Sequence, residues 1–213
     1  MLAFPEEGAT EVPTVVVIDD DVCMRRSLSR LMRTAGLRAQ TYSSASDFMR
    51  DSSIPQAACI LLDLQMPGRS GNELHEWLLA QGISVPVVFL TGHGDVPASV
   101  RAMRRGAVDF LLKPVDEQVL LEAIRRAIDM HASQKSLAMR QKQIIKRYTC
   151  LTAREREVMA QVVDGRLNKQ IAADLGISLK TVKVHRARTM EKMEVRSVAA
   201  LVRACDMAGI LQK

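Results

Sequence analysis

The sequence predicts an α/β domain followed by a small domain made of helices. Over the first 130 residues, five short apolar or β-branched runs alternate with amphipathic helical patterns, and no connection between them is long. This alternation is typical of a doubly wound, mostly parallel five-stranded sheet. After residue 148 the strand-like runs stop, and four helical patterns follow, separated by glycines or a short polar step.

The position of each expected element follows from its apolar spacing and from the residues that interrupt it. Strands are expected at 14–18, 37–42, 57–62, 85–90 and 107–112. Helices of the first domain are expected at 23–35, at 44–49, through Leu74 and Leu78, at 96–105 and at 116–130. The helices of the second domain are expected at 152–163, 168–175, 178–193 and 197–208.

The distribution of charge supports a division into two domains. We expect a flexible leader at 1–12, a first domain at 13–130, a basic helical linker at 131–148 and a second domain at 149–213. Residues 1–130 carry 13 Lys and Arg against 17 Asp and Glu, a net charge of −4, whereas residues 131–213 carry 17 against 7, a net charge of +10. The basic half is a candidate for binding a polyanion, although a solvated basic surface would have the same composition.

The cysteines and the apolar runs predict a cytoplasmic protein without a membrane partner. Cys23, Cys59, Cys150 and Cys205 are far apart and form no Cys-x-x-Cys pair, so neither a disulfide framework nor a zinc site is indicated. Apolar runs end well before the roughly 18 residues that a membrane span needs, and the N-terminus lacks a basic stretch followed by an apolar core.

Polar side chains lie where the expected strands end. Asp19 and Asp20 follow the first strand, Asp63 the third, Thr91 the fourth and Lys113 the fifth. Since ligands bind at the carboxyl edge of such a sheet, these five residues form a candidate site. Each of these residues alone could simply cap a helix or be solvated. That explanation is much less convincing for all five together, because they lie at the ends of four strands.

Several carboxylates at one edge repel each other unless a cation neutralises them. Mg²⁺ prefers oxygen ligands, which Asp19, Asp20 and Asp63 could supply together with the backbone carbonyl of Gln65. With Lys113 also neutralising phosphoryl oxygens, the Asp63 carboxylate could attack phosphorus and form an acyl phosphate. The hydroxyl of Thr91 could then hydrogen-bond the bound phosphoryl group.

The second domain contains the spacing of a helix-turn-helix. A helix at 168–175, a tight turn at Gly176 and a helix capped by Ser178 follow one another. On the second of these helices, Val182, Thr189, Met190 and Met193 are expected to pack inward. The free face would enter the major groove, with further residues holding the phosphate backbone. The candidate DNA contacts are Asn168, Lys169, Lys180, Thr181, Lys183, Val184, His185, Ala187 and Arg188.

Two residues of this helix have structural alternatives. His185 could instead be a structural histidine at a helix boundary. Arg186 falls toward the core side, where its stem is expected to pack and its head to reach an acid such as Glu155, so we do not expect it to contact DNA.

The strand-end motifs resemble the receiver domain of two-component response regulators, which has a flavodoxin-like fold. They are Val17-Ile-Asp-Asp20, Leu62-Asp-Leu-Gln-Met-Pro-Gly68, Leu90-Thr91 and Phe110-Leu-Leu-Lys-Pro114. The resemblance implies that Asp63 accepts a phosphoryl group from a sensor histidine kinase with Mg²⁺. It further implies a cis bond before Pro114 and a conformational switch formed by Thr91 and Phe110.

The helical half resembles the LuxR-type DNA-binding domain, through Leu151-Thr-Ala-Arg-Glu-Arg-Glu-Val158, Asn168-Lys-Gln-Ile-Ala172 and Thr181-Val-Lys-Val-His185. Together the two halves are similar to response regulators of the NarL/FixJ family, and the segment Thr91-Gly-His-Gly-Asp95 favours the FixJ branch. The resemblance implies binding to double-stranded promoter DNA, a homodimer through the fourth helix and fifth strand of the receiver, and RNA polymerase as a further partner.

Two other functions are compatible with parts of the pattern. A Mg²⁺-dependent phosphatase or phosphotransferase could use Asp63 as its nucleophile on small substrates, but no acid stands two positions later to act as a general acid. Alternatively, the helical half could serve protein contacts only. Because a general acid is lacking two positions after Asp63, we expect no enzymatic turnover beyond phosphorylation of Asp63 from a phosphodonor and slow loss of the phosphoryl group.

Overall fold

The computed structural model describes residues 12–51, 56–92 and 106–210 of the chain. The chain divides into two compact units, Met1–Gln134 and Lys135–Lys213. Within the described ranges, no helix has both the length and the apolar character needed to cross a bilayer.

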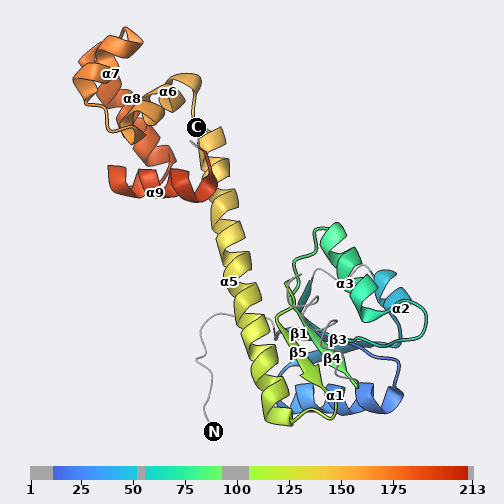
Figure 1. Cartoon of the computed structure of the whole chain (residues 1–213). Helices are drawn as coiled ribbons and strands as arrows, with labels where there is room; N and C mark the ends of the chain where they lie inside the picture. Colours follow the sequence, from blue (N-terminus) through green and yellow to red (C-terminus); the bar gives the residue numbers. More distant parts are fainter. Residues whose placement is uncertain (1–11, 52–55, 93–105, 211–213) are drawn as a thin grey trace. The chain divides into compact units, whose positions relative to one another are not determined.

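The first unit contains the predicted five-stranded parallel sheet (Figure 1). Its strand order is β2-β1-β3-β4-β5, with every neighbouring pair parallel. The strands are β1 (Thr14–Ile18), β2 (Arg38–Tyr42), β3 (Ala57–Asp63), β4 (Val87–Thr91) and β5 (Asp109–Leu112). In the described part of this unit, the helices that begin are α1 (Val22–Thr34), α2 (Ala45–Met49), α3 (Gly71–Ala80) and α5 (Glu117–Thr149). The doubly wound α/β fold class is confirmed.

Two strand boundaries differ from the prediction by more than one residue. β4 begins at Val87 and β5 at Asp109, each two residues later than the sequence pattern indicates. Pro86 has no N–H to donate to a ladder, and only its carbonyl takes part, accepting from the Ile60 N–H at 2.9 Å. The helix expected at 96–105 lies outside the described residues.

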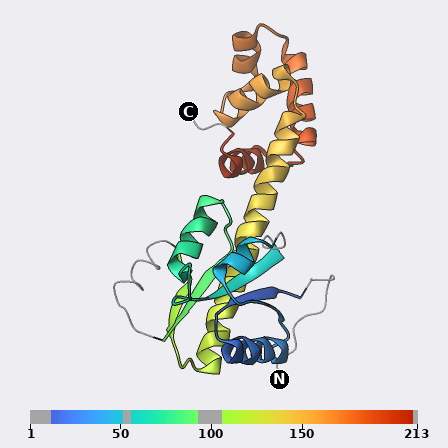
Figure 2. The same cartoon turned by 90° about the vertical axis from the view of Figure 1, so that its right-hand side faces the viewer.

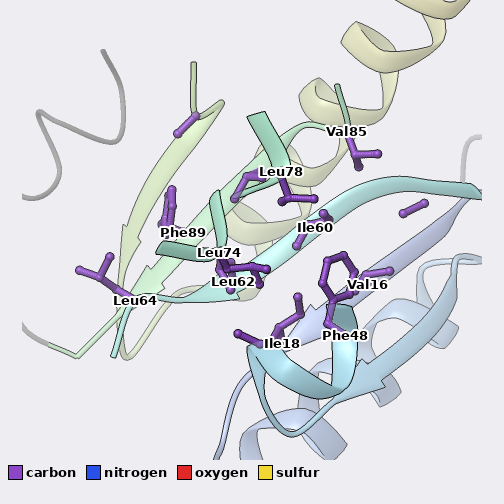
Figure 3. Packing of buried hydrophobic residues seen from close by; sticks show 14 of the residues in the cluster. Val16, Ile18, Phe48, Ile60, Leu62, Leu64, Leu74, Leu78, Val85 and Phe89 are labelled. Carbon is purple, nitrogen blue, oxygen red and sulfur yellow. The ribbon is translucent and has the colours of Figure 1, made fainter. Parts of the chain in front are cut away.

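Alternate side chains of the sheet pack against helices on its two faces. On one face, the cluster contains Phe48 of α2 with Leu74 and Leu78 of α3, packed over Ile60 and Leu62 (Figure 3). On the other face, residues of α1 and α5 cover the intervening strand residues, among them Leu28, Met32, Leu120 and Ile124. Because both faces are covered, the central strands are nearly continuous apolar runs, and polar residues first appear where these strands end.

The second unit consists of the end of α5 and the helices α6 (Ala153–Val163), α7 (Asn168–Leu175), α8 (Leu179–Lys192) and α9 (Val198–Ala208), coloured from yellow to red in Figure 2. Residues 131–148, which were predicted to form a helical linker, are part of the helix α5. Hydroxyl side chains cap three of these helices: Thr152, Ser178 and Ser197 each accept from a backbone N–H three residues later. Gly176 ends α7 in the left-handed conformation, with φ of 63°.

The N-terminus of α7 lacks such a cap and offers a site for stabilisation. Leu167 is the N-cap residue, has φ −74° and ψ 150°, and is 68% exposed. Ser178 has nearly the same backbone angles (φ −68°, ψ 150°) and does cap α8. We therefore expect Leu167→Ser to raise the free energy of unfolding of the second unit by about 1 kcal/mol.

For Leu167→Ser, this gain corresponds to an increase of about 4–8 °C in the midpoint of the thermal unfolding of the second unit. Leu167→Ala is the control, since it removes the same exposed apolar side chain but supplies no acceptor. An equal gain in both variants would show that removal of the leucine, rather than capping, causes the effect.

Candidate functional site

The loop after β1 and the last residue of β3 bring three carboxylates together at the carboxyl edge of the sheet. Asp19 is 1% exposed and Asp63 is 6% exposed, whereas Asp20 is exposed. One carboxylate oxygen from each of these residues lies within 4.8 Å of the others. Three acids at such separations favour a bound cation, and an all-oxygen set with access to water suits Mg²⁺.

Lys113 closes this cluster from the end of β5. Its Nζ donates to Asp19 Oδ2 at 2.7 Å and to Asp63 Oδ2 at 2.8 Å. The Lys113 N–H donates to the Thr91 carbonyl at 2.7 Å, which fixes the end of β5 beside the end of β4. The bond between Lys113 and Pro114 is cis, as the receiver resemblance implies. One ammonium group therefore contacts two acids at the ends of β1 and β3, which are neighbouring strands of the sheet.

Burial and pairing act against each other in this cluster. Burial raises the pKa of Asp19, and the hydrogen bond from Lys113 only partly offsets this. For Lys113, burial lowers the pKa, but the hydrogen bonds to Asp19 and Asp63 outweigh it, so the pKa of the ammonium group rises. Lys113 therefore stays protonated at neutral pH and provides a permanent positive charge within the site.

Backbone groups hold the two buried carboxylates. Asp19 Oδ1 accepts from the Asp21 N–H at 2.8 Å, and Asp63 Oδ1 accepts from the Gln65 N–H at 3.1 Å. Arg25 was not among the predicted site residues, but its Nη1 donates to the Asp19 carbonyl at 2.7 Å and to the Asp20 carbonyl at 2.8 Å. It therefore stabilises the acidic loop from α1, and the only signal in the sequence was an arginine shortly after the acids.

Gly71 allows α3 to begin directly beside Asp63. A Cβ atom at this position would lie 2.3 Å from the Asp63 carbonyl oxygen and 3.0 Å from the Leu64 Cα. Both contacts are with backbone atoms, which cannot turn away as a side chain can. The close approach fixes the loop after β3 against the first turn of α3.

Thr91 and Phe110 occupy neighbouring strands. Thr91 is fully buried at the end of β4, next to the cluster through the Lys113 backbone. Phe110 on β5 is partly buried, and its ring centroid lies 6.2 Å from that of Phe89. The two residues predicted to form a switch are thus joined by the β4–β5 ladder, in which Leu90 pairs with Leu111.

In the second unit, α8 has a buried and an exposed face. Val182, Thr189 and Met193 are buried and Met190 packs against the same core, as predicted. On the opposite side lie the exposed predicted residues Lys180, Lys183, Val184, Ala187 and Arg188, while Thr181 and His185 are half-buried. On α7, Lys169 is exposed and Asn168 is half-buried.

The expected partner of Arg186 was wrong. Arg186 Nη1 donates to Asn168 Oδ1 at 2.9 Å, which joins α8 to the start of α7. Glu155 is buried and instead accepts from Lys192 Nζ at 2.7 Å, and this hydrogen bond lowers the pKa of the Glu155 carboxyl. The α-helical period placed Arg186 near the core side, but it could not select between two polar partners on different helices.

Profiles of known families match both units. The response regulator receiver domain matches residues 15–125, and the luxR family of bacterial regulatory proteins matches residues 149–205. The chain belongs to the response regulator family. Within that family it is of the NarL/FixJ type, combining a receiver with a LuxR-type DNA-binding domain.

Relatives of this regulator are similar over nearly their whole length. The transcriptional regulatory protein FixJ of Azorhizobium caulinodans is 43% identical over 92% of this chain and 93% of its own. The response regulator protein TodT of Pseudomonas putida is 42% identical over 90% of this chain and 85% of its own. The solved structure of the response regulator StyR is 44% identical, has a TM-score of 0.84, and is matched over 92% of this chain and 98% of its own.

Proposed function

We propose that Asp63 accepts a phosphoryl group from a cognate sensor histidine kinase, and that this modification controls binding to promoter DNA. The observation that carries the proposal is the contact of Lys113 Nζ with both Asp19 and Asp63. It leaves the Asp63 carboxylate next to a fixed positive charge and an acidic cluster suited to a divalent cation. The negative oxygens of an incoming phosphoryl group would be neutralised by Lys113 and by a divalent cation bound to the acidic cluster.

The transfer requires a carboxylate nucleophile and neutralised phosphoryl oxygens. An Asp63 carboxylate oxygen would form a bond to phosphorus, while the bond from phosphorus to the donor breaks and its electron pair leaves with the donor. Lys113 would hold a phosphoryl oxygen. Asp19, Asp20, Asp63 and the Gln65 carbonyl would hold Mg²⁺, which supplies further neutralisation of the phosphoryl charge when bound. Turnover would be limited to this modification and its slow hydrolysis.

Phosphorylation of Asp63 would change which surfaces of the receiver are able to form a dimer. The Thr91 hydroxyl would bind the phosphoryl group, and the Phe110 ring would follow it inward. Receiver dimerisation through the fourth helix and β5 would result, although residues 96–105 lie outside the described part of the chain. The regulator would act in the cytoplasm, with a receiver at 13–130 joined through 131–148 to the DNA-binding domain at 149–213.

DNA recognition would use the exposed face of α8 and the start of α7. Lys180, Lys183, Val184 and Ala187 would face the major groove or its edges, while Asn168, Lys169, Thr181, His185 and Arg188 would hold phosphates. The bound dimer would then contact RNA polymerase. A helical half that serves only protein contacts would not bind duplex DNA with the steep salt dependence that neutralised phosphates cause.

The proposal is tested by measuring DNA affinity of the full chain, on genomic fragments that it selects, with and without acetyl phosphate and Mg²⁺. Phosphodonor is expected to tighten binding, and Lys183→Ala to weaken it by about 1–3 kcal/mol, because Lys183 lies on the exposed face of α8. Lys142→Ala, which removes an exposed charge from α5, is the matched control. Equal affinities for both variants would exclude this face as the recognition surface.

A further inference from the structure

A groove of about 500 Å³ lies between the start of α7 and one side of α8. We call it the α7–α8 notch; its lining includes Leu167, Asn168, Lys169, Leu179, Lys183 and Arg186. The ammonium groups of Lys169 and Lys183 have no ion-pair partner among the described residues, and both side chains are exposed. Apolar walls with free cations at the rim are complementary to a sugar–phosphate strand.

The hydrogen bond inside this notch fixes which way the Asn168 amide points. A guanidinium group has only donors, so the atom that faces Arg186 Nη1 at 2.9 Å must be the amide oxygen of Asn168. The NH₂ group of the same amide is therefore turned away from Arg186. It is a donor only, and a phosphate oxygen is the kind of acceptor that it can bind.

We propose that the α7–α8 notch receives the backbone of a DNA strand at the edge of the major groove, and that Arg186 is the positioning residue that presents the Asn168 NH₂ group to a phosphate. The inference rests on the proposed DNA-binding function and adds Arg186, which was not predicted to contact DNA, to the interface. Arg186 acts through Asn168, because its guanidinium group is already engaged with the amide oxygen.

Asn168→Asp is the decisive variant. It keeps an acceptor for Arg186 and makes that pair charge-assisted, but it replaces the NH₂ group with a second carboxylate oxygen that repels phosphate. We expect the thermal midpoint to stay the same or rise, while affinity for a mixed-sequence duplex at moderate salt falls by about tenfold or more. Since non-specific binding depends on phosphate contacts, the test does not need the operator.

The matched control is Gln170→Glu, which makes the same change of charge on the same helix. Gln170 Oε1 accepts from the Leu167 N–H at 2.8 Å, and a glutamate preserves that acceptor. We expect this control to lose less than about threefold in affinity at moderate salt, because screening weakens a charge that touches no phosphate. Equal losses in Asn168→Asp and Gln170→Glu would overturn the inference.

A double-mutant cycle tests the positioning role. Arg186→Met should weaken DNA binding. Adding Asn168→Ala to the Arg186→Met variant should lower the affinity little further, because without Arg186 the amide has already lost its orientation. Additive losses would overturn the role of Arg186. In the salt titration, Lys169→Ala should lower the slope of log K against log salt by about 0.9, whereas Asn168→Ala should leave the slope unchanged because it releases no counterion.

These outcomes separate the two proposals. If Lys169→Ala and Lys183→Ala weaken binding but Asn168→Asp does not, the notch inference fails and the DNA-binding proposal stands. If the full chain binds the duplex without salt dependence, the DNA-binding proposal fails as well.

Discussion

Asp63→Asn is expected to abolish labelling of the regulator by acetyl phosphate in the presence of Mg²⁺. An amide oxygen is too weak a nucleophile to displace the donor, while its shape and its ability to accept from Lys113 are retained. The readout is intact-protein mass spectrometry, in which the wild-type chain gains the mass of one phosphoryl group and the variant gains none. DNA binding by the variant should no longer respond to the phosphodonor.

Asp47→Asn is the control for this experiment. Asp47 is a partly exposed residue of α2 that lies outside the acidic cluster. Its carboxylate accepts from the Ser43 hydroxyl, and its backbone N–H donates to the Ser44 hydroxyl. Labelling should match that of the wild-type chain. Persistent labelling of the Asp63→Asn chain would mean that another group, with Asp19 or Asp20 first to be examined, accepts the phosphoryl group.

Gly71→Ala is expected to destabilise the receiver and to slow its labelling. The added Cβ would stand 2.3 Å from the Asp63 carbonyl oxygen, so either β3 or the first turn of α3 must move. Overpacking of this kind costs about 1–3 kcal/mol. Urea unfolding of the first unit should show a lower midpoint with an unchanged slope, and the labelling rate should fall because the backbone that holds the nucleophile has shifted.

Gly92→Ala provides the comparison at another strand end. Among the described atoms, nothing lies within 4 Å of the position that a Cβ would take at Gly92. This variant should therefore keep the stability of the wild-type receiver. If Gly71→Ala were as stable as Gly92→Ala, α3 would have to begin farther from Asp63 than it does in this structure.

Local patterns predicted much of the fold. β-Branched and apolar runs placed β1 and β3 to within a residue. Periodic apolar residues, with the Ser178 cap for α8, placed α7 and α8 equally well. These signals depend on neighbours within one or two turns of the chain, so they can be read without tertiary structure. The starts of β4 and β5 were less accurate, since ladder hydrogen bonds, not composition, decide where a strand begins.

The sequence by itself determined that acids, a threonine and a lysine end the strands, and that one face of α8 is basic. It did not determine which of these groups touch. Lys113 contacts acids 94 and 50 residues away along the chain, and Arg186 selects Asn168 over the buried Glu155. Such choices depend on distances between separately formed elements, and on the cost of leaving a buried charge unpaired. Only packing in three dimensions sets these.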